Sequence, residues 1–219
     1  NMWDDTHKLI NLYGIASAMA FLHSQDIVHE DLKTINILMD GYLFPHLVDS
    51  WNKEFKTGHK EVKGNPIYTA PEFYETLEYT KETDVYAFAI VAYEIMTSKL
   101  PLTELEYIDL VNKVKDEGYR PSLDEIPEAY QSLIDQCWRT TPSERPTFEQ
   151  IVSQLKSDEA FLTEEMDHEL FNAYVEYINQ YEEAWTSEQK EIKFNGVMKN
   201  RAPSPVTFDV TTVTHEDLE

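Results

Sequence analysis

Apolar residues recur at helical spacing along most of the chain. Residues 6–25 carry an apolar stripe on one side, and Thr6 is suited to cap the start of this predicted helix. Residues 83–95 are apolar on every side, which predicts a helix buried at the centre of the domain. Later stripes predict three more helices, one of which has Pro127 in its first turn, where proline is tolerated. They cover residues 105–114, 127–138 and 148–155.

A different pattern separates the first helix from the central one. Residues 37–39 and 43–48 read as two short strands, joined by Asp40-Gly41, a pair that supports a positive φ in a tight turn. A hairpin of this kind brings Asn36 and Asp49, which flank it, to the same end. The chain is therefore expected to be mainly α-helical, with one small β-hairpin that carries functional residues.

Composition narrows the class of protein. The 219 residues suffice for one medium domain and a tail, and 42% hydrophobic residues indicate a folded chain. The net charge of -23 opposes binding to nucleic acid and to anionic membranes. Cys137 is the only cysteine, which excludes an internal disulfide. No apolar run approaches the ~20 residues that span a bilayer. No signal sequence precedes Asn1, so the cytoplasm is the expected compartment.

Four polar side chains near the hairpin are candidates for chemistry. Asn36 and Asp49 offer two oxygen ligands on a rigid pair of strands. Such a pair suits Mg²⁺, which takes few protein ligands and completes its shell with phosphate and water. Asp31 and Lys33, on the preceding loop, are placed to face a nucleophile's proton and a transferring phosphoryl group. The pattern predicts a site for a metal-bound triphosphate.

This stretch resembles the catalytic loop and metal-binding turn of eukaryotic protein kinases, H-R-D-L-x-x-x-N followed by D-F-G. Residues 29–36 read HEDLKTIN, and residues 49–51 read DSW. The sequence of residues 31–38, DLKTINIL, is most similar to that of the tyrosine-kinase-like group, whose members mostly phosphorylate Ser and Thr.

Further motifs of the same family follow in order. Residues 64–72 read GNPIYTAPE and resemble the end of a kinase activation segment. Residues 83–90, TDVYAFAI, resemble the opening of the central kinase helix. Arg145 resembles the late arginine that pairs with the glutamate of A-P-E, here Glu72.

The resemblance implies a role for each matched residue. Asp31 would orient the substrate hydroxyl and accept its proton, and Lys33 would offset charge on the γ-phosphoryl group. Asn36 and Asp49 would hold Mg²⁺ across the phosphates of ATP. Leu38 would form the apolar floor under the adenine.

Other matched residues would support this site. His29 belongs to the catalytic loop, and Asp84 would be a buried acceptor that fixes the backbone of that loop. Glu72 and Arg145 would form a buried ion pair. The chain also contains candidate phosphorylation sites. They are Thr57, Tyr68, Thr69 and Ser204.

The resemblance covers the large lobe of a kinase domain, residues 1–156. Its catalytic loop is 29–36 and its activation segment 49–72. The Gly-rich loop and strand lysine of the small lobe are not found before the first helix, so the small lobe is expected to be absent. Residues 157–185 form an acidic helical extension whose apolar face is expected to pack on the lobe. Residues 186–219 read as a flexible tail.

Two departures from the family pattern keep two functions open. Glu30 replaces an arginine that often receives an activation-loop phosphate, and Ser50-Trp51 replaces Phe-Gly. The first hypothesis is a protein kinase that uses ATP and Mg²⁺ on protein hydroxyls, active as the complete parent protein and inactive as this chain alone. The alternative is a pseudokinase or scaffold that binds protein partners without catalysis. The substrate and the oligomeric state are left open.

Overall fold

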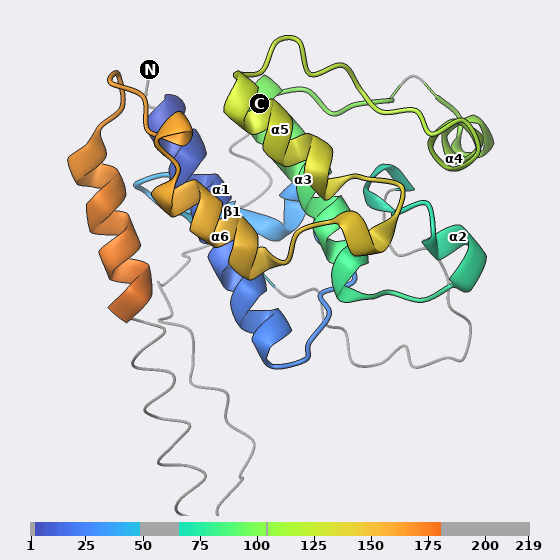
Figure 1. Ribbon diagram of the computed structural model, residues 1–219, viewed down its shortest axis with the longest axis horizontal. Coiled ribbons are helices and arrows are strands. Elements are labelled where there is room, and N and C mark those ends of the chain that lie inside the picture. The colour runs from blue at the N-terminus through green and yellow to red at the C-terminus, as the bar shows by residue number, and fades with distance from the viewer. Residues whose placement is uncertain (1–2, 49–65, 104, 181–219) are drawn as a thin grey trace, which may run out of the picture. The chain divides into compact units, whose positions relative to one another are not determined.

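The computed structural model describes residues 3–48, 66–103 and 105–180 (Figure 1). The longer elements are α1 (Asp5–Ser24), β1 (Ile37–Met39), β2 (Pro45–Leu47), α2 (Phe73–Thr76), α3 (Lys81–Thr97), α4 (Tyr107–Lys115), α5 (Glu128–Cys137) and α6 (Phe148–Ser157). Short 3₁₀ turns are η1 (Thr34–Asn36), η2 (Pro66–Tyr68), η3 (Pro142–Glu144) and η4 (Glu159–Phe161). A further helix covers residues 168–180. For this part of the chain, the predicted mainly α-helical fold with one hairpin is confirmed.

Helix α1 is a central helix and not the one-sided helix that its sequence predicts. All of residues 9–17 are buried, because α1 contacts α3, α6 and β2 on different sides. Its N-cap is Asp4, whose side chain accepts a hydrogen bond from the His7 backbone amide at 2.9 Å. The predicted cap at Thr6 is therefore wrong, and the Thr6 side chain is buried.

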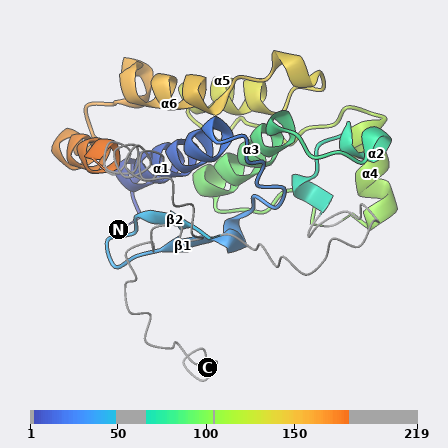
Figure 2. The ribbon, with the colours of Figure 1, turned by 90° about the horizontal axis from the view of Figure 1, so that it is seen from below.

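The described helices form layers around α1 and α3. Figure 2 shows the hairpin on one side of α1 and α5 and α6 on the other. Helix α3 begins with a capping box in which Thr80 and Thr83 each bond the other's backbone amide. Residues 83–92 of this helix are all buried, as its uniformly apolar sequence predicts.

The hairpin is antiparallel and pairs Ile37 with Leu47 and Leu38 with His46. Its second strand is shorter than the predicted 43–48. The turn also differs from the prediction, since Leu43 and not Asp40-Gly41 has the positive φ, at 61°. The Asp40 carboxylate stabilises the turn by accepting the backbone amides of Tyr42 and Phe44, at 2.8 and 2.9 Å.

Two smaller predictions need correction. Pro127 is the residue before α5 and not a member of its first turn. Helix α4 begins at Tyr107, after the predicted start, and buries only Leu110 and Val114. Ile108, predicted to lie on its apolar stripe, is 70% exposed.

Residues 158–180 follow α6 and pack on the helical layers. Asp167 precedes the last helix and accepts the Leu170 backbone amide at 2.9 Å. The buried side chains of this segment include Phe171, Tyr174 and Val175. The domain boundaries at 156 and 185 stay predictions, and residues 181–219 lie outside the described part. Among the described helices, none is long and apolar enough to cross a membrane.

Candidate functional site

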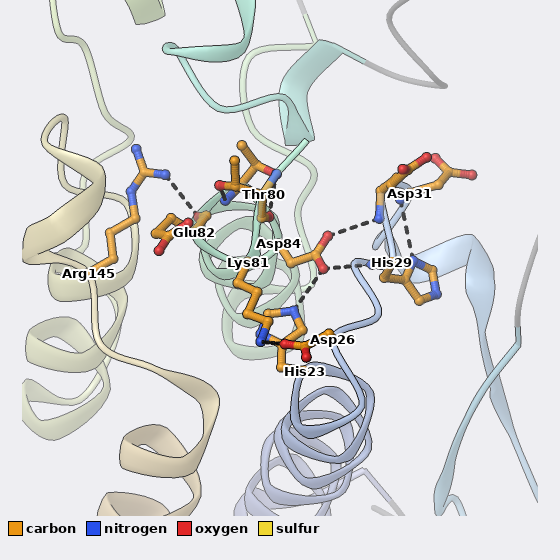
Figure 3. A network of polar contacts seen from close by, with 11 residues as sticks. His23, Asp26, His29, Asp31, Thr80, Lys81, Glu82, Asp84 and Arg145 are labelled. Atoms are coloured by element: carbon orange, nitrogen blue, oxygen red, sulfur yellow. Dashed lines mark hydrogen bonds and ion pairs between the residues drawn. The ribbon is translucent and has the colours of Figure 1, made fainter. Parts of the chain in front are cut away.

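The loop between α1 and η1 is held by one buried carboxylate (Figure 3). Asp84, in the first turn of α3 and 2% exposed, accepts the backbone amide of His29 at 2.8 Å and that of Glu30 at 3.0 Å. His23 Nε2, in the last turn of α1, lies 2.9 Å from the same carboxylate. A buried carboxylate is tolerated where hydrogen bonds surround it. The loop backbone is thereby joined to both central helices.

The same loop contains a strained residue. Glu30 has φ 67°, in the left-handed region that non-glycine residues seldom adopt. The bond from its amide to Asp84 supports this conformation. Strained residues held in this way cluster at functional sites, and Glu30 directly precedes the candidate base Asp31. The sequence showed the unusual acid at position 30 but not its backbone.

Three of the four predicted polar residues meet. Lys33 Nζ lies 2.9 Å from Asp31 Oδ1. Asn36 Nδ2 donates to Asp31 Oδ2 at 3.1 Å and to the Asp31 carbonyl oxygen at 2.7 Å. The η1 turn places Asn36 back against the loop. The fourth residue, Asp49, lies outside the described residues and follows Val48, whose amide donates to the Asn36 carbonyl oxygen at 2.9 Å.

The donor set fits a hard cation. Because the amide nitrogen of Asn36 is bonded to Asp31, its Oδ1 is left outside the hydrogen bonds of the described residues. An amide oxygen is a ligand that Mg²⁺ accepts. Within the described ranges, no group of three His, Cys, Asp or Glu side chains is placed to hold a metal ion. A magnesium ion bound mainly by phosphate and water needs no such group.

Leu38, the residue predicted to lie under the adenine, is on the hairpin and is 50% exposed.

A second polar cluster joins the loop to the segment that follows residue 65. Thr34 Oγ1 donates to Glu94 Oε2 at 3.1 Å and lies 3.2 Å from the Tyr68 hydroxyl. The Tyr68 hydroxyl donates to Glu94 Oε1. Burial raises the pKa of Glu94, and burial next to Glu94 raises that of Tyr68. Sequence reasoning missed this cluster, although an acid inside an apolar helix is a rare feature that signals a buried partner.

The candidate phosphorylation sites differ in accessibility. Thr69 is only 5% exposed, and the Tyr68 hydroxyl is bonded within the cluster with Glu94. In this conformation neither hydroxyl is open to a modifying enzyme. Thr57 and Ser204 lie outside the described residues, and all four sites stay predictions.

Arg145, whose side chain is buried, forms a two-point ion pair with Glu72, whose side chain is 19% exposed. The two guanidinium nitrogens of Arg145 donate to the Glu72 carboxylate at 2.6 and 2.8 Å. The same guanidinium donates to the carbonyl oxygens of Arg139 and Glu82, at 2.8 and 2.9 Å, and lies over the ring of Tyr86. Such a pair is favourable when all of its hydrogen bonds are formed. It fixes the 66–76 segment to the start of α3 and to the loop before α6.

Comparisons with known proteins agree with this geometry. Residues 3–155 match the family described as protein tyrosine and serine/threonine kinase. A protein kinase and PP2C-like domain-containing protein of Arabidopsis thaliana is 33% identical over 70% of the chain. The RGS domain-containing serine/threonine-protein kinase A of Dictyostelium discoideum is 38% identical over 66%. The serine/threonine/tyrosine-protein kinase HT1 of Arabidopsis thaliana is 35% identical over 65%.

The chain spans only part of these curated relatives, namely 29%, 13% and 37% of their lengths. The residues that match the family model, 3–155, contain the loop, the hairpin and the central helices. Because the family match covers more than half of the chain, this chain belongs to the protein tyrosine and serine/threonine kinase family.

Proposed function

We propose that the complete protein is a protein kinase of the tyrosine-kinase-like group, which transfers the γ-phosphoryl group of ATP to Ser or Thr hydroxyls of proteins. In this proposal residues 1–156 are the large lobe of the kinase domain. One observation carries it: the side chains of Asp31, Lys33 and Asn36 meet on a loop whose backbone is fixed by Asp84. Positioning and charge neutralisation account for most of phosphoryl-transfer catalysis, and this arrangement provides both.

Asp31 is the proposed base. Lys33 holds one of its carboxylate oxygens and the Asn36 amide holds the other, which fixes the direction in which the carboxylate faces. A substrate hydroxyl within hydrogen-bond reach would be oriented by Asp31 and lose its proton to it. Lys33 carries the positive charge that would offset the charge of the transferring phosphoryl group.

Asn36, through its amide oxygen, and Asp49 are the proposed magnesium ligands. When bound, Mg²⁺ supplies charge neutralisation across the β- and γ-phosphates. Leu38, exposed on the hairpin, is the proposed apolar contact for the adenine ring.

A second function is favoured by specific residues. Glu30 occupies the position of an arginine in the family motif, and Ser50-Trp51 that of Phe-Gly. A carboxylate at position 30 would repel an activation-loop phosphate instead of binding it. These changes favour a pseudokinase or scaffold that binds protein partners without phosphoryl transfer.

The test uses the complete gene product, with all sequence that surrounds this chain. Transfer of phosphate from radiolabelled ATP to a generic protein substrate is measured with and without Mg²⁺, alongside calorimetric titration of ATP. We expect Mg²⁺-dependent transfer that falls by about 10²-fold or more in Asp31→Asn, since general-base catalysis contributes about that factor. Asp49→Asn is expected to weaken Mg²⁺-dependent ATP binding.

Asp26→Asn is the matched control, because Asp26 is an exposed carboxylate near the same loop that pairs only with Lys81 among the described residues. It should leave transfer unchanged. A wild-type protein that binds Mg²⁺-ATP but transfers no phosphate would support the scaffold function. A wild-type protein that does neither would overturn the kinase proposal.

A further inference from the structure

The part of the chain that matches the kinase family ends at residue 155. Residues 158–180, called the 158–180 segment below, lie beyond it. They nevertheless pack on the elements that carry the candidate nucleotide site. The first attachment is polar: the Asp167 backbone amide donates to the Thr6 hydroxyl oxygen at 3.0 Å. The second is aromatic: Phe171 meets Tyr13 of α1 edge to face, with ring centroids 5.7 Å apart. The segment is thus fixed along α1.

Tyr174 extends this contact to the hairpin. Its ring centroid lies 4.7 Å from that of Phe44, in the hairpin turn, and 6.4 Å from that of Tyr13. Its hydroxyl lies directly over Gly14, where a Cβ atom would clash with the oxygen. Tyr174 is 3% exposed. The ring therefore fills a space bounded by α1 and the hairpin turn, and the absence of a side chain at position 14 makes room for it.

The hairpin turn is also held by α1. Asn11, fully buried, donates through Nδ2 to the Leu43 carbonyl oxygen at 2.9 Å and to the His7 carbonyl oxygen at 2.8 Å. Leu43 is the turn residue with the positive φ. The turn is thereby held by both Asn11 and Tyr174.

The position of this turn matters at the opposite end of the hairpin. The two strands have only three residues each, and a two-stranded hairpin of that size is marginally stable by itself. Leu38 lies in the middle of it, and at its open end the Val48 amide donates to the Asn36 carbonyl oxygen. The placement of Asn36 and Leu38 therefore depends on what the hairpin packs against.

We infer that the 158–180 segment is a positioning element for the nucleotide site, in which Tyr174 fixes the hairpin so that Asn36 and Leu38 are placed to bind Mg²⁺-ATP. This inference rests on the proposed function. It means that a segment outside the family match contributes to the affinity for ATP. Displacing the segment from α1 should weaken ATP binding, although no group that touches ATP is altered.

The test compares Tyr174→Ala, Tyr174→Phe and Ile134→Ala in the complete gene product. Tyr174→Phe keeps the ring on Phe44 and is the conservative variant. Ile134 is buried in α5, which packs on α3 and lies on the other side of α1 from the hairpin (Figure 2), so Ile134→Ala is a control for a general loss of core packing. Amide hydrogen exchange of residues 37–48 and calorimetric titration of Mg²⁺-ATP are measured at temperatures equally far below each variant's Tm.

We expect Tyr174→Ala to speed hairpin exchange and to weaken Mg²⁺-ATP binding by about tenfold or more, because small displacements of a binding group are costly. Tyr174→Phe and Ile134→Ala should remain within about twofold of the wild type. Where Tyr174→Ala does not fold, Tyr174→Leu replaces it, since leucine fills part of the space without the ring.

Three outcomes would overturn the inference or the proposal beneath it. Faster hairpin exchange with unchanged ATP affinity would make the segment a packing element only. An equal loss of affinity in Ile134→Ala would assign the effect to general stability. A wild-type protein that binds no Mg²⁺-ATP would instead refute the proposed function, and the inference with it.

Discussion

Gly14 lies in the interior of α1, where glycine is normally unfavourable. In this helix its lack of a side chain is required, because both Tyr174 and Pro45 occupy the space that a Cβ would take. At single positions such as this one, contacts between distant segments override the local preference for helix-forming residues. The same holds for Asn11 and Thr6, polar residues buried in α1 that bond partners far along the chain.

Gly14→Ala is expected to destabilise the protein. In an open helix this change would stabilise by about 1 kcal/mol, but overpacking of this kind costs about 1–3 kcal/mol. Urea unfolding of the complete protein measures the difference. Tyr174→Phe removes the nearest oxygen and should restore part of the loss in the double variant. An increase in stability for Gly14→Ala alone would contradict the packing described.

Glu94→Gln is expected to gain stability relative to the wild type as the pH rises. Burial raises the pKa of Glu94 in the folded state above its value in the unfolded chain. Below the unfolded pKa both states hold a neutral acid, so the two proteins differ least there. As the pH rises through the folded pKa, the free energy of unfolding of the wild type falls, because the partly buried Glu94 carboxylate must ionise. The glutamine variant has no such loss. Thermal unfolding at pH 4 to 7 measures the difference in Tm between the two proteins. A difference that stays the same at every pH would contradict the prediction.

Individual elements are fixed in the fold by single buried side chains at their ends. Asp84 joins the first turn of α3 to the loop between α1 and η1 and to the last turn of α1. Arg145 joins the residues before α6 to Glu72, before α2, and to Glu82 in α3. Asp84 accepts two backbone amides of the loop, and Arg145 donates to the backbone carbonyl oxygens of Arg139 and Glu82. The orientation of the loop and of the 66–76 segment follows from these bonds.

Arg145→Met is expected to lower the free energy of unfolding by about 3–5 kcal/mol, because it leaves the Glu72 carboxylate without its partner. The double variant Glu72→Gln/Arg145→Met should recover part of this loss, since it removes the unpaired charge. Urea unfolding of the two single variants and of the double variant gives the coupling energy. Additive losses would show that the pair is not a coupled unit.

At the scale of the whole molecule, periodicity predicted the helices better than it predicted their surroundings. The apolar sequence of α3 required burial on every side, and α3 is buried. The stripe on α1 indicated one buried face, since a pattern of side chains does not reveal that polar Asn11 and Ser17 will also be enclosed. The meeting of Asp31, Lys33 and Asn36 was predictable from their spacing. The contacts of Glu94 and Tyr174 were not, because they depend on how distant segments pack.

Salt is expected to stabilise this 219-residue chain. The net charge of -23 places like charges close together in the folded chain, and added salt screens their repulsion. Raising NaCl from low concentration should raise Tm by a few degrees, since about 1 kcal/mol shifts Tm by about 2–4 °C at this size. Differential scanning calorimetry checks this, with sucrose as an uncharged comparison. A fall in Tm would show that attractive ion pairs outweigh the repulsion.

The layer formed by Phe171 and Tyr174 also bears on how the domain can be produced. A protein cut after Leu155, where the family match ends, would present the rings of Tyr13 and Phe44 to water. Neighbouring molecules would then associate through these aromatic faces, so such a fragment should precipitate or form inclusion bodies. The shortest fragment that remains dispersed should extend to at least residue 180.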